Sequence, residues 1–218
     1  MTISCFLVDL DDTLYAEVDY VDSGYRAIAP LIADANNLDA ETVLAHLRYE
    51  FRKYGRVGAF DRLYKTLAIT TPAIPDLVAA YRAHAPDIAF YPNADEALAR
   101  LSTIAPVAIV TDGDGTMQRR KVEALGLTSR VGAIAYCWDL GAPKPATKGY
   151  LHAAALLRAD PQRAVIVGDD PFHDMAAART LGAAAVRVRT GRLADLDVSA
   201  PDVREYATFA AFVGALPA

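Results

Sequence analysis

The chain is predicted to fold as a doubly wound α/β protein with a five-stranded parallel sheet and a small helical domain inserted after the first strand. Short, partly β-branched apolar runs recur along the chain, and helical patterns separate the last four of them. Parallel strands need long crossover connections, which are usually helices. Hydrophobic residues make up 53% of the 218, enough for a substantial core.

The predicted strands are short apolar runs bounded by turn or polar residues, as expected for strands buried on both faces of a sheet. They span residues 4–9, 106–111, 131–136, 163–169 and 183–188.

Helical patterns fill the spaces around the later strands. They cover residues 93–102, 116–125, 146–158 and 172–181, and a last helix is expected over 203–213. Asn93 is a candidate N-cap of the first, because its side chain can accept a backbone hydrogen bond. Gly126 and Gly182 stand where helices are expected to end, since glycine tolerates the left-handed conformation there.

The segment between the first and second predicted strands differs from the later ones, because it holds four helical patterns and no strand. They cover residues 18–36, 41–54, 59–68 and 74–84. Asp39 can cap the second helix and Gly55 can end it. We therefore assign residues 1–14 and 88–218 to the α/β core domain and residues 15–87 to a separate helical domain.

Acidic residues stand at the end of the first strand. Asp9 and Asp11 are two positions apart, so both begin on the same face of the strand. Carboxylates this close repel each other unless a cation or a shared proton compensates. This pair indicates a chemical role.

Other polar residues follow later strands and are expected to meet Asp9 and Asp11, because ligands bind at the carboxyl edge of an open α/β sheet. They are Thr111, Asp112, Lys144, Asp169, Asp170 and Asp174. Asp9, Asp169 and Asp174 would supply hard oxygen ligands suited to Mg²⁺.

The residue types indicate phosphoryl transfer. A carboxylate such as Asp9 can attack phosphorus and form an aspartyl phosphate. Thr111 can donate to a phosphate oxygen, and Lys144 adds a positive charge. Asp11 would protonate the leaving oxygen and then deprotonate water, so its pKa is expected to be raised.

At these residues the chain resembles the haloacid dehalogenase (HAD) superfamily of phosphohydrolases. The run from Asp9 to Thr13 matches the first motif, Thr111 the second, Lys144 the third, and residues 168–174 the fourth. The resemblance implies a Rossmann-like core, a class-one helical cap at 15–87 and a magnesium cofactor. It implies that Asp9 is the nucleophile and Asp11 the acid/base, and that Asp169 and Asp174 serve the metal.

Further assignments complete the predicted site. We also expect Asp9 and Asp11 to contact the metal, and Lys144 and Asp112 to contact the substrate. Asp112 departs from the asparagine of many relatives, and the roles of Asp170 and His173 are left open. The basic, tyrosine-rich stretch at 48–65 is either a solvated helix face or a pocket for a nucleotide-like or flavin-like phosphate ester, with Arg56 as the first choice for a contact.

The predicted function is hydrolysis of a small soluble phosphomonoester, of the sugar phosphate, nucleotide or flavin mononucleotide type. The alternatives are a phosphomutase or a dehalogenase on the same scaffold, or a catalytically silent HAD-like binding module. The presence of Asp11, Asp169 and Asp174 speaks against the dehalogenase, which would need neither acid/base nor magnesium.

The amino-acid composition limits which partners and which cellular location are expected for this protein. The net charge of −5 disfavours nucleic-acid and membrane partners. No membrane-length apolar run or signal peptide is evident, so a cytoplasmic location is expected. Cys5 and Cys137 match no metal spacing and are expected to be reduced thiols packed as small hydrophobic groups. The oligomeric state is left open.

Overall fold

The computed structural model describes residues 2–198 and 200–217. This part of the chain divides into two compact units. One unit runs up to Glu17 and resumes at Ile88, and the other is Val18–Asp87. The role of class-one cap, which the resemblance implies for the helical insertion, stays a prediction.

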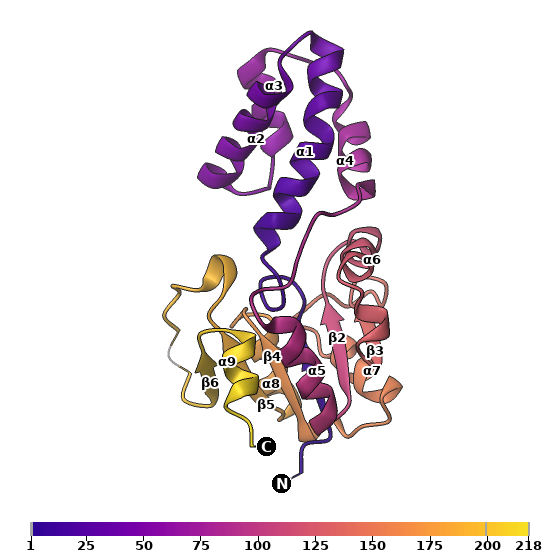
Figure 1. Ribbon diagram of the computed structural model, residues 1–218, viewed down its shortest axis with the longest axis vertical. Coiled ribbons are helices and arrows are strands. Elements are labelled where there is room, and N and C mark those ends of the chain that lie inside the picture. The colour runs from indigo at the N-terminus through magenta and orange to yellow at the C-terminus, as the bar shows by residue number, and fades with distance from the viewer. Residues whose placement is uncertain (1, 199, 218) are drawn as a thin grey trace. The chain divides into compact units, whose positions relative to one another are not determined.

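The first unit contains a parallel sheet in the order β3-β2-β1-β4-β5-β6 (Figure 1). Its strands are β1 (Cys5–Val8), β2 (Val107–Thr111), β3 (Ala133–Tyr136), β4 (Ala164–Gly168), β5 (Ala184–Val188) and β6 (Val203–Tyr206). The doubly wound α/β class is confirmed. Among the described residues the sheet has six strands, so the prediction of five was wrong.

The additional strand, β6, lies where the start of a helix over 203–213 was predicted. Residues Val203–Tyr206 pair with β5 at the sheet edge and are only partly buried. Helix α9 (Phe209–Gly214) begins later, after Thr208 accepts a hydrogen bond from the backbone of Ala211 at 3.1 Å. Residues Val203–Tyr206 form a strand because their backbone pairs with β5. Four residues of mixed polarity are too few to show the alternation that would predict a strand from the sequence.

Apart from α9, the helices of the first unit follow the predicted intervals, with ends shifted by a few residues. They are α5 (Ala94–Ile104), α6 (Gly115–Ala124), α7 (Lys148–Leu156), α8 (Asp174–Leu181) and α9, with short 3₁₀ turns at Leu127–Ser129, Pro161–Arg163 and Gly191–Leu193. Gly126 and Gly182 adopt left-handed conformations at helix ends, as predicted. Asn93 is the N-cap residue of α5, as predicted, but its side chain makes no capping hydrogen bond.

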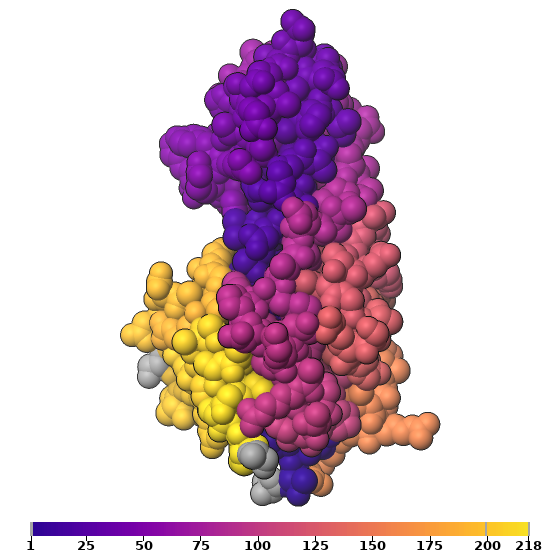
Figure 2. Space-filling model, viewed as in Figure 1, coloured from indigo at the N-terminus to yellow at the C-terminus, as the bar shows by residue number. Residues whose placement is uncertain are grey.

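Apolar side chains fill both faces of the sheet. On one face, Leu7 and Ile166 pack with Tyr150 of α7 and Met175 of α8. On the other, the rings of Phe6 and Phe212 lie 6.3 Å apart edge to face. Helices α5 and α9 pack together there, and their magenta and yellow surfaces adjoin in Figure 2. Central strands buried on both faces explain why their sequences are continuously apolar.

The second unit is helical. Its elements are α1 (Glu17–Asn36, which begins one residue before the unit boundary), α2 (Ala40–Tyr54), α3 (Ala59–Leu67) and α4 (Ile74–Ala83). Asp39 caps α2 by accepting from the Thr42 backbone at 2.8 Å, and Gly55 ends it at a φ of 75°. Both assignments are confirmed.

A separate apolar core holds this helical unit together. Ile28 and Ile32 of α1 are fully buried with Leu47 of α2 and Leu63 of α3. These positions recur at helical spacing, which explains why the pattern was readable in the sequence.

None of the helices among the described residues is both long enough and apolar enough to cross a membrane.

The two cysteines lie in the first unit. Cys5 and Cys137 are buried free thiols and belong to the same apolar core as α7. Their expected role as small apolar groups is confirmed.

We expect Leu7→Ala to lower the free energy of unfolding by about 2–5 kcal/mol. Leu7 is fully buried in the strand at the centre of the sheet, so the truncation leaves a cavity. Urea unfolding measures the change. Leu151→Ala, at a side chain that is 42% exposed on α7, is the matched control and should change stability by no more than about 0.5 kcal/mol. Equal effects of the two substitutions would contradict the assignment of the core.

Candidate active site

The ends of three adjacent strands bring the predicted residues of the first unit together. Asp9 follows β1, and its backbone N–H donates to the Val167 carbonyl at 2.8 Å. Asp169 follows β4 on one side of β1, and Thr111 ends β2 on the other. Because the strands are parallel, all three side chains reach the same edge.

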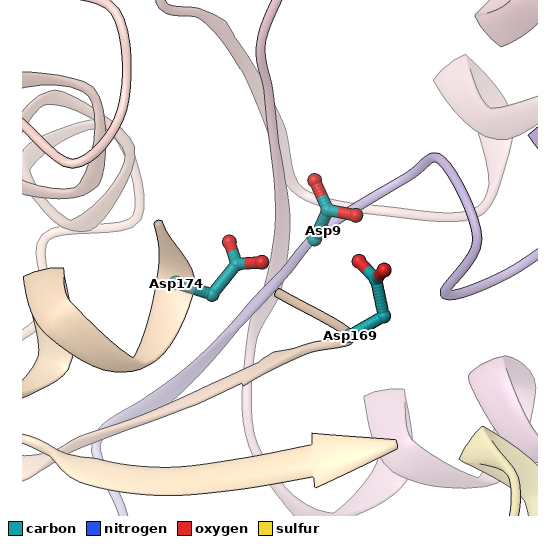
Figure 3. A group of neighbouring side chains, drawn as sticks. All are labelled: Asp9, Asp169 and Asp174. Atoms are coloured by element: carbon teal, nitrogen blue, oxygen red, sulfur yellow. The ribbon is translucent and has the colours of Figure 1, made fainter. Parts of the chain in front are cut away.

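Three carboxylates meet at this edge. Ligand oxygens of Asp9, Asp169 and Asp174 lie within 4.8 Å of one another, and all three residues are buried (Figure 3). Asp174 is the first residue of α8, directly above the end of β4. Gly168 makes this approach possible, because an added Cβ would lie 2.3 Å from Asp174 Oδ2.

Lys144 is the cation of this group. Its Nζ donates to Asp9 Oδ1 at 2.5 Å and to Asp174 Oδ1 at 2.7 Å, and only 3% of its side chain is exposed. The Tyr150 hydroxyl also donates to Asp174 Oδ1 at 2.7 Å. Burial opposes the charge on Lys144, but Asp174 and Asp9 outweigh it and raise its pKa well above the ordinary value.

The negative charge of the cluster exceeds what Lys144 neutralises. Three carboxylates and one ammonium group sum to −2 when all are ionised. Burial, together with the neighbouring carboxylates, raises the pKa of Asp169 to about 9. Burial and the charges of Asp174 and Asp11 raise the pKa of Asp9 to about 7, although Lys144 opposes this. These raised pKa values express the repulsion among the three carboxylates, which a bound proton or a cation relieves.

The donor set fits a divalent oxygen-loving cation. Carboxylate oxygens are the ligands that Mg²⁺ prefers, and ligands across such an ion are about 4.2 Å apart at bonds of about 2.1 Å. The three ligand oxygens, which lie within 4.8 Å of one another, are close enough to share such an ion. The excess charge of −2 matches the charge of the ion. Asp9, Asp169 and Asp174 are therefore able to hold the expected magnesium.

Asp11 lies outside this group of three and has its own partners. Its Oδ1 accepts from Lys121 Nζ at 2.6 Å and from the Tyr15 hydroxyl, and its Oδ2 accepts from Gln118 Nε2 at 2.7 Å. Burial alone would raise the pKa of Asp11, but Lys121 and these hydrogen bonds outweigh it and lower the pKa. The expected upward shift of the Asp11 pKa was wrong. A metal-binding role for Asp11 stays a prediction.

Thr111 and Asp112 end the second strand, and their contacts differ. The Thr111 hydroxyl oxygen accepts a hydrogen bond from Gln118 Nε2, so its own hydrogen points elsewhere. The Asp112 carboxylate accepts from the backbone N–H of Lys144 at 3.1 Å. The side chain of Asp112 thus supports the loop that carries Lys144, and its substrate-binding role stays a prediction.

The roles left open for Asp170 and His173 have a local explanation. Asp170 Oδ1 accepts from the backbone N–H groups of Phe172 at 2.7 Å and His173 at 3.2 Å. Its other oxygen lies 3.0 Å from His173 Nδ1. Asp170 therefore shapes the turn between β4 and α8.

Arg56 belongs to the other unit. It lies on the exposed segment between α2 and α3. Its predicted contact with substrate stays a prediction.

Among the described residues, four whose side chains bond to the carboxylates of the site were not identified from the sequence. They are Tyr15, Gln118, Lys121 and Tyr150. A signal existed for two of them, because Gln118 and Lys121 are three residues apart in the helix after β2 and so share one helix face. The sequence carries no comparable signal for the two tyrosines.

Comparison with known proteins agrees with this geometry. Residues 3–182 match the family model described as haloacid dehalogenase-like hydrolase. The chain belongs to this family. The resemblance read from the four motifs is thereby confirmed, together with the prediction of a hydrolytic enzyme.

Relatives of this HAD-like hydrolase carry phosphatase names. It is 28% identical to the glyceraldehyde 3-phosphate phosphatase of Methanopyrus kandleri over 206 residues, which cover 89% of this chain and 88% of the relative. It is 31% identical to the phosphoserine phosphatase of Thermus thermophilus, over 52% of this chain and 46% of the relative. These relatives support the class of phosphoric monoester hydrolases.

Solved structures share its fold. The HAD hydrolase YfnB of Bacillus subtilis, determined with bound magnesium, aligns with a TM-score of 0.67 at 16% identity and 96% coverage of both chains. The L-2-haloacid dehalogenase of Xanthobacter autotrophicus aligns with a TM-score of 0.63 at 18% identity and 98% coverage of both. At these identities the likeness concerns the fold alone.

The raised pKa of Asp169 predicts a pH dependence of stability in EDTA. The pKa of Asp169 is about 9 in the folded protein, above its ordinary value of 3.8. Between these two pH values the folded state therefore binds more protons than the unfolded state. Stability should therefore fall as pH rises from about 4 to 9. Asp169→Asn should flatten this decline, measured by urea unfolding at pH 5 and pH 8. The exposed control Asp34→Asn should keep it, and equal declines in all three proteins would contradict the prediction.

Gly168→Ala should lower the free energy of unfolding by about 1–3 kcal/mol, because the new methyl group meets a buried side chain. The added Cβ would lie 2.4 Å from Asp174 Cγ. Gly214→Ala is the control, since an added Cβ there has no neighbour within 4 Å. Urea unfolding measures both. A Gly168→Ala protein as stable as the wild type would show that Asp174 is not packed against β4.

Proposed function

We propose that this HAD-like hydrolase is a Mg²⁺-dependent phosphatase that hydrolyses a small phosphomonoester through an aspartyl-phosphate intermediate. The observation that carries the proposal is the position of Asp9. It is held by Lys144 at 2.5 Å, beside Asp169 and Asp174, and two residues before a carboxylate with separate partners. A nucleophile, a cation site and an acid/base group are thereby adjacent.

In the first half-reaction, an Asp9 oxygen attacks the phosphorus atom and the bond from phosphorus to the ester oxygen breaks. The Lys144 ammonium group and the Thr111 hydroxyl group bind phosphate oxygens as hydrogen-bond donors. Bound Mg²⁺, held by Asp9, Asp169 and Asp174, would supply the positive charge that lets two anions approach. Asp11 gives a proton to the departing oxygen, which leaves as an alcohol.

Asp11 must gain this proton when substrate binds, because Lys121 and its hydrogen-bond donors lower the pKa of Asp11. A phosphate anion beside Asp11 adds negative charge and so raises its proton affinity. In the second half-reaction, Asp11 takes a proton from water, the water oxygen attacks the phosphorus atom, and the bond from phosphorus to the Asp9 oxygen breaks. Inorganic phosphate leaves and Asp9 is restored.

The names of the relatives that match most of the chain support a substrate class. Several are named glyceraldehyde 3-phosphate phosphatase, and one that matches about half of the chain is named phosphoserine phosphatase. We place three-carbon metabolite phosphates first in a substrate panel, followed by the sugar phosphates, nucleotides and flavin mononucleotide. Contact of Arg56 with the substrate and a cytoplasmic location remain part of the proposal.

Release of inorganic phosphate separates the proposed function from its alternatives. A phosphomutase would return the phosphoryl group to a second hydroxyl, and a dehalogenase would release halide. A silent binding module would release neither. The buried Asp169 and Asp174 beside Asp9 favour the phosphatase over the dehalogenase, which has no use for a cation site.

Asp9→Asn should reduce phosphate release by about 10³-fold or more, because the amide is a poor nucleophile. Malachite green detection of phosphate across the panel measures this loss in the presence of Mg²⁺. The exposed control Asp34→Asn should retain wild-type activity. EDTA should suppress wild-type release, and added Mg²⁺ should restore it. Magnesium-dependent turnover by Asp9→Asn would contradict the assignment of the nucleophile.

A further inference from the structure

A compact polar cluster holds the Asp11 carboxylate from both sides. Lys121 and Tyr15 donate to Oδ1, and Gln118 donates to Oδ2. Lys121 and Gln118 come from helix α6, more than a hundred residues along the chain from Asp11. The carboxylate is thus fixed at both oxygens by groups outside the first motif.

The burial of Lys121 indicates that this arrangement has a purpose beyond stability. Its side chain is 3% exposed, and its Nζ lies 2.6 Å from Asp11 Oδ1. Burying an ammonium group is costly, and a buried ion pair seldom stabilises a protein more than apolar packing would. Arg119, on the same helix, illustrates the usual arrangement, because it is 55% exposed and pairs with Asp139.

Gln118 links Asp11 to the end of β2. Its Nε2 donates one hydrogen to Asp11 Oδ2 at 2.7 Å and the other to the Thr111 hydroxyl oxygen. Both amide hydrogens are thereby used. The spacing between the acid/base carboxylate and the phosphate-binding hydroxyl is consequently set by one side chain.

We propose that Lys121 and Gln118 are positioning residues that hold the Asp11 carboxylate where the ester oxygen departs and align it with the Thr111 hydroxyl. This inference rests on the proposed phosphatase activity. It assigns a role to two residues of α6 that belong to none of the four motifs. Neither residue is required to touch the substrate, because each acts through Asp11.

Leaving-group dependence tests the proposal. Proton donation matters most for a poor leaving group, so glycerol phosphate and p-nitrophenyl phosphate are compared by kcat/KM, which reports the first half-reaction. Lys121→Met should lower kcat/KM for glycerol phosphate by about 10²–10⁴-fold, the usual contribution of a general acid. The loss for p-nitrophenyl phosphate should be less than about tenfold. Arg119→Met, which removes a cation from the exposed face of α6, should leave both values near those of the wild type.

A second background shows whether Lys121 acts through Asp11. In Asp11→Asn protein, Lys121→Met should cause no further loss of kcat/KM for glycerol phosphate, since the group that it positions is gone. An equal loss in both backgrounds, or equal losses for the two esters, would overturn the proposal and indicate direct phosphate binding or a structural role.

Gln118→Leu keeps the proposal testable if Lys121→Met does not fold, as judged by thermal unfolding. It should show the same preference for the better leaving group, with a smaller loss on glycerol phosphate because Lys121 remains. Equal losses on both esters would overturn the proposal here as well. A wild-type protein that releases phosphate from neither ester overturns the phosphatase assignment and this inference together. Wild-type release with no leaving-group effect in either variant overturns the inference alone.

Discussion

The mutual repulsion of three buried carboxylates is the constraint on which the site depends. Asp9, Asp169 and Asp174 converge within 4.8 Å, and Lys144 offers one positive charge between two of them. Such close carboxylates repel one another, and the raised pKa values of Asp9 and Asp169 express that cost. The same excess of negative charge is what would give a divalent cation its affinity for the site. Stability and cation binding are therefore opposed at this edge of the sheet.

The backbone around the cluster is built to tolerate this close approach. β1 lies between β2 and β4, so residues at three neighbouring strand ends share one edge. Gly168 leaves room for the Asp174 side chain at the start of α8. Asp170 ties the intervening turn through the N–H groups of Phe172 and His173. The carboxylates are thus held by backbone geometry on rigid elements, which keeps them together despite their repulsion.

Two carboxylates only two residues apart have opposite environments. Asp9 lies among other acids, and its pKa is raised, whereas Asp11 lies against Lys121 and two neutral donors, and its pKa is lowered. Environments that separate the proton affinities of neighbouring carboxylates are typical of acid/base sites. A cation would lower the proton affinity of Asp9, and a phosphate anion would raise that of Asp11. Ligands would thereby move both groups toward the states that the proposed chemistry requires.

The sequence by itself determined the fold class, the central strands and the residues at the strand ends, because apolar runs, helical spacing and motif order are local properties. It also determined caps such as Asp39, whose partner Thr42 is three residues away. Only the tertiary structure decided the edge strand β6, which exists through pairing with β5. Only the tertiary structure placed Gln118 and Lys121 on Asp11, more than a hundred residues away, and so reversed the expected shift of its pKa. Pairing and electrostatic fields depend on distance in space, and a single sequence does not specify that distance.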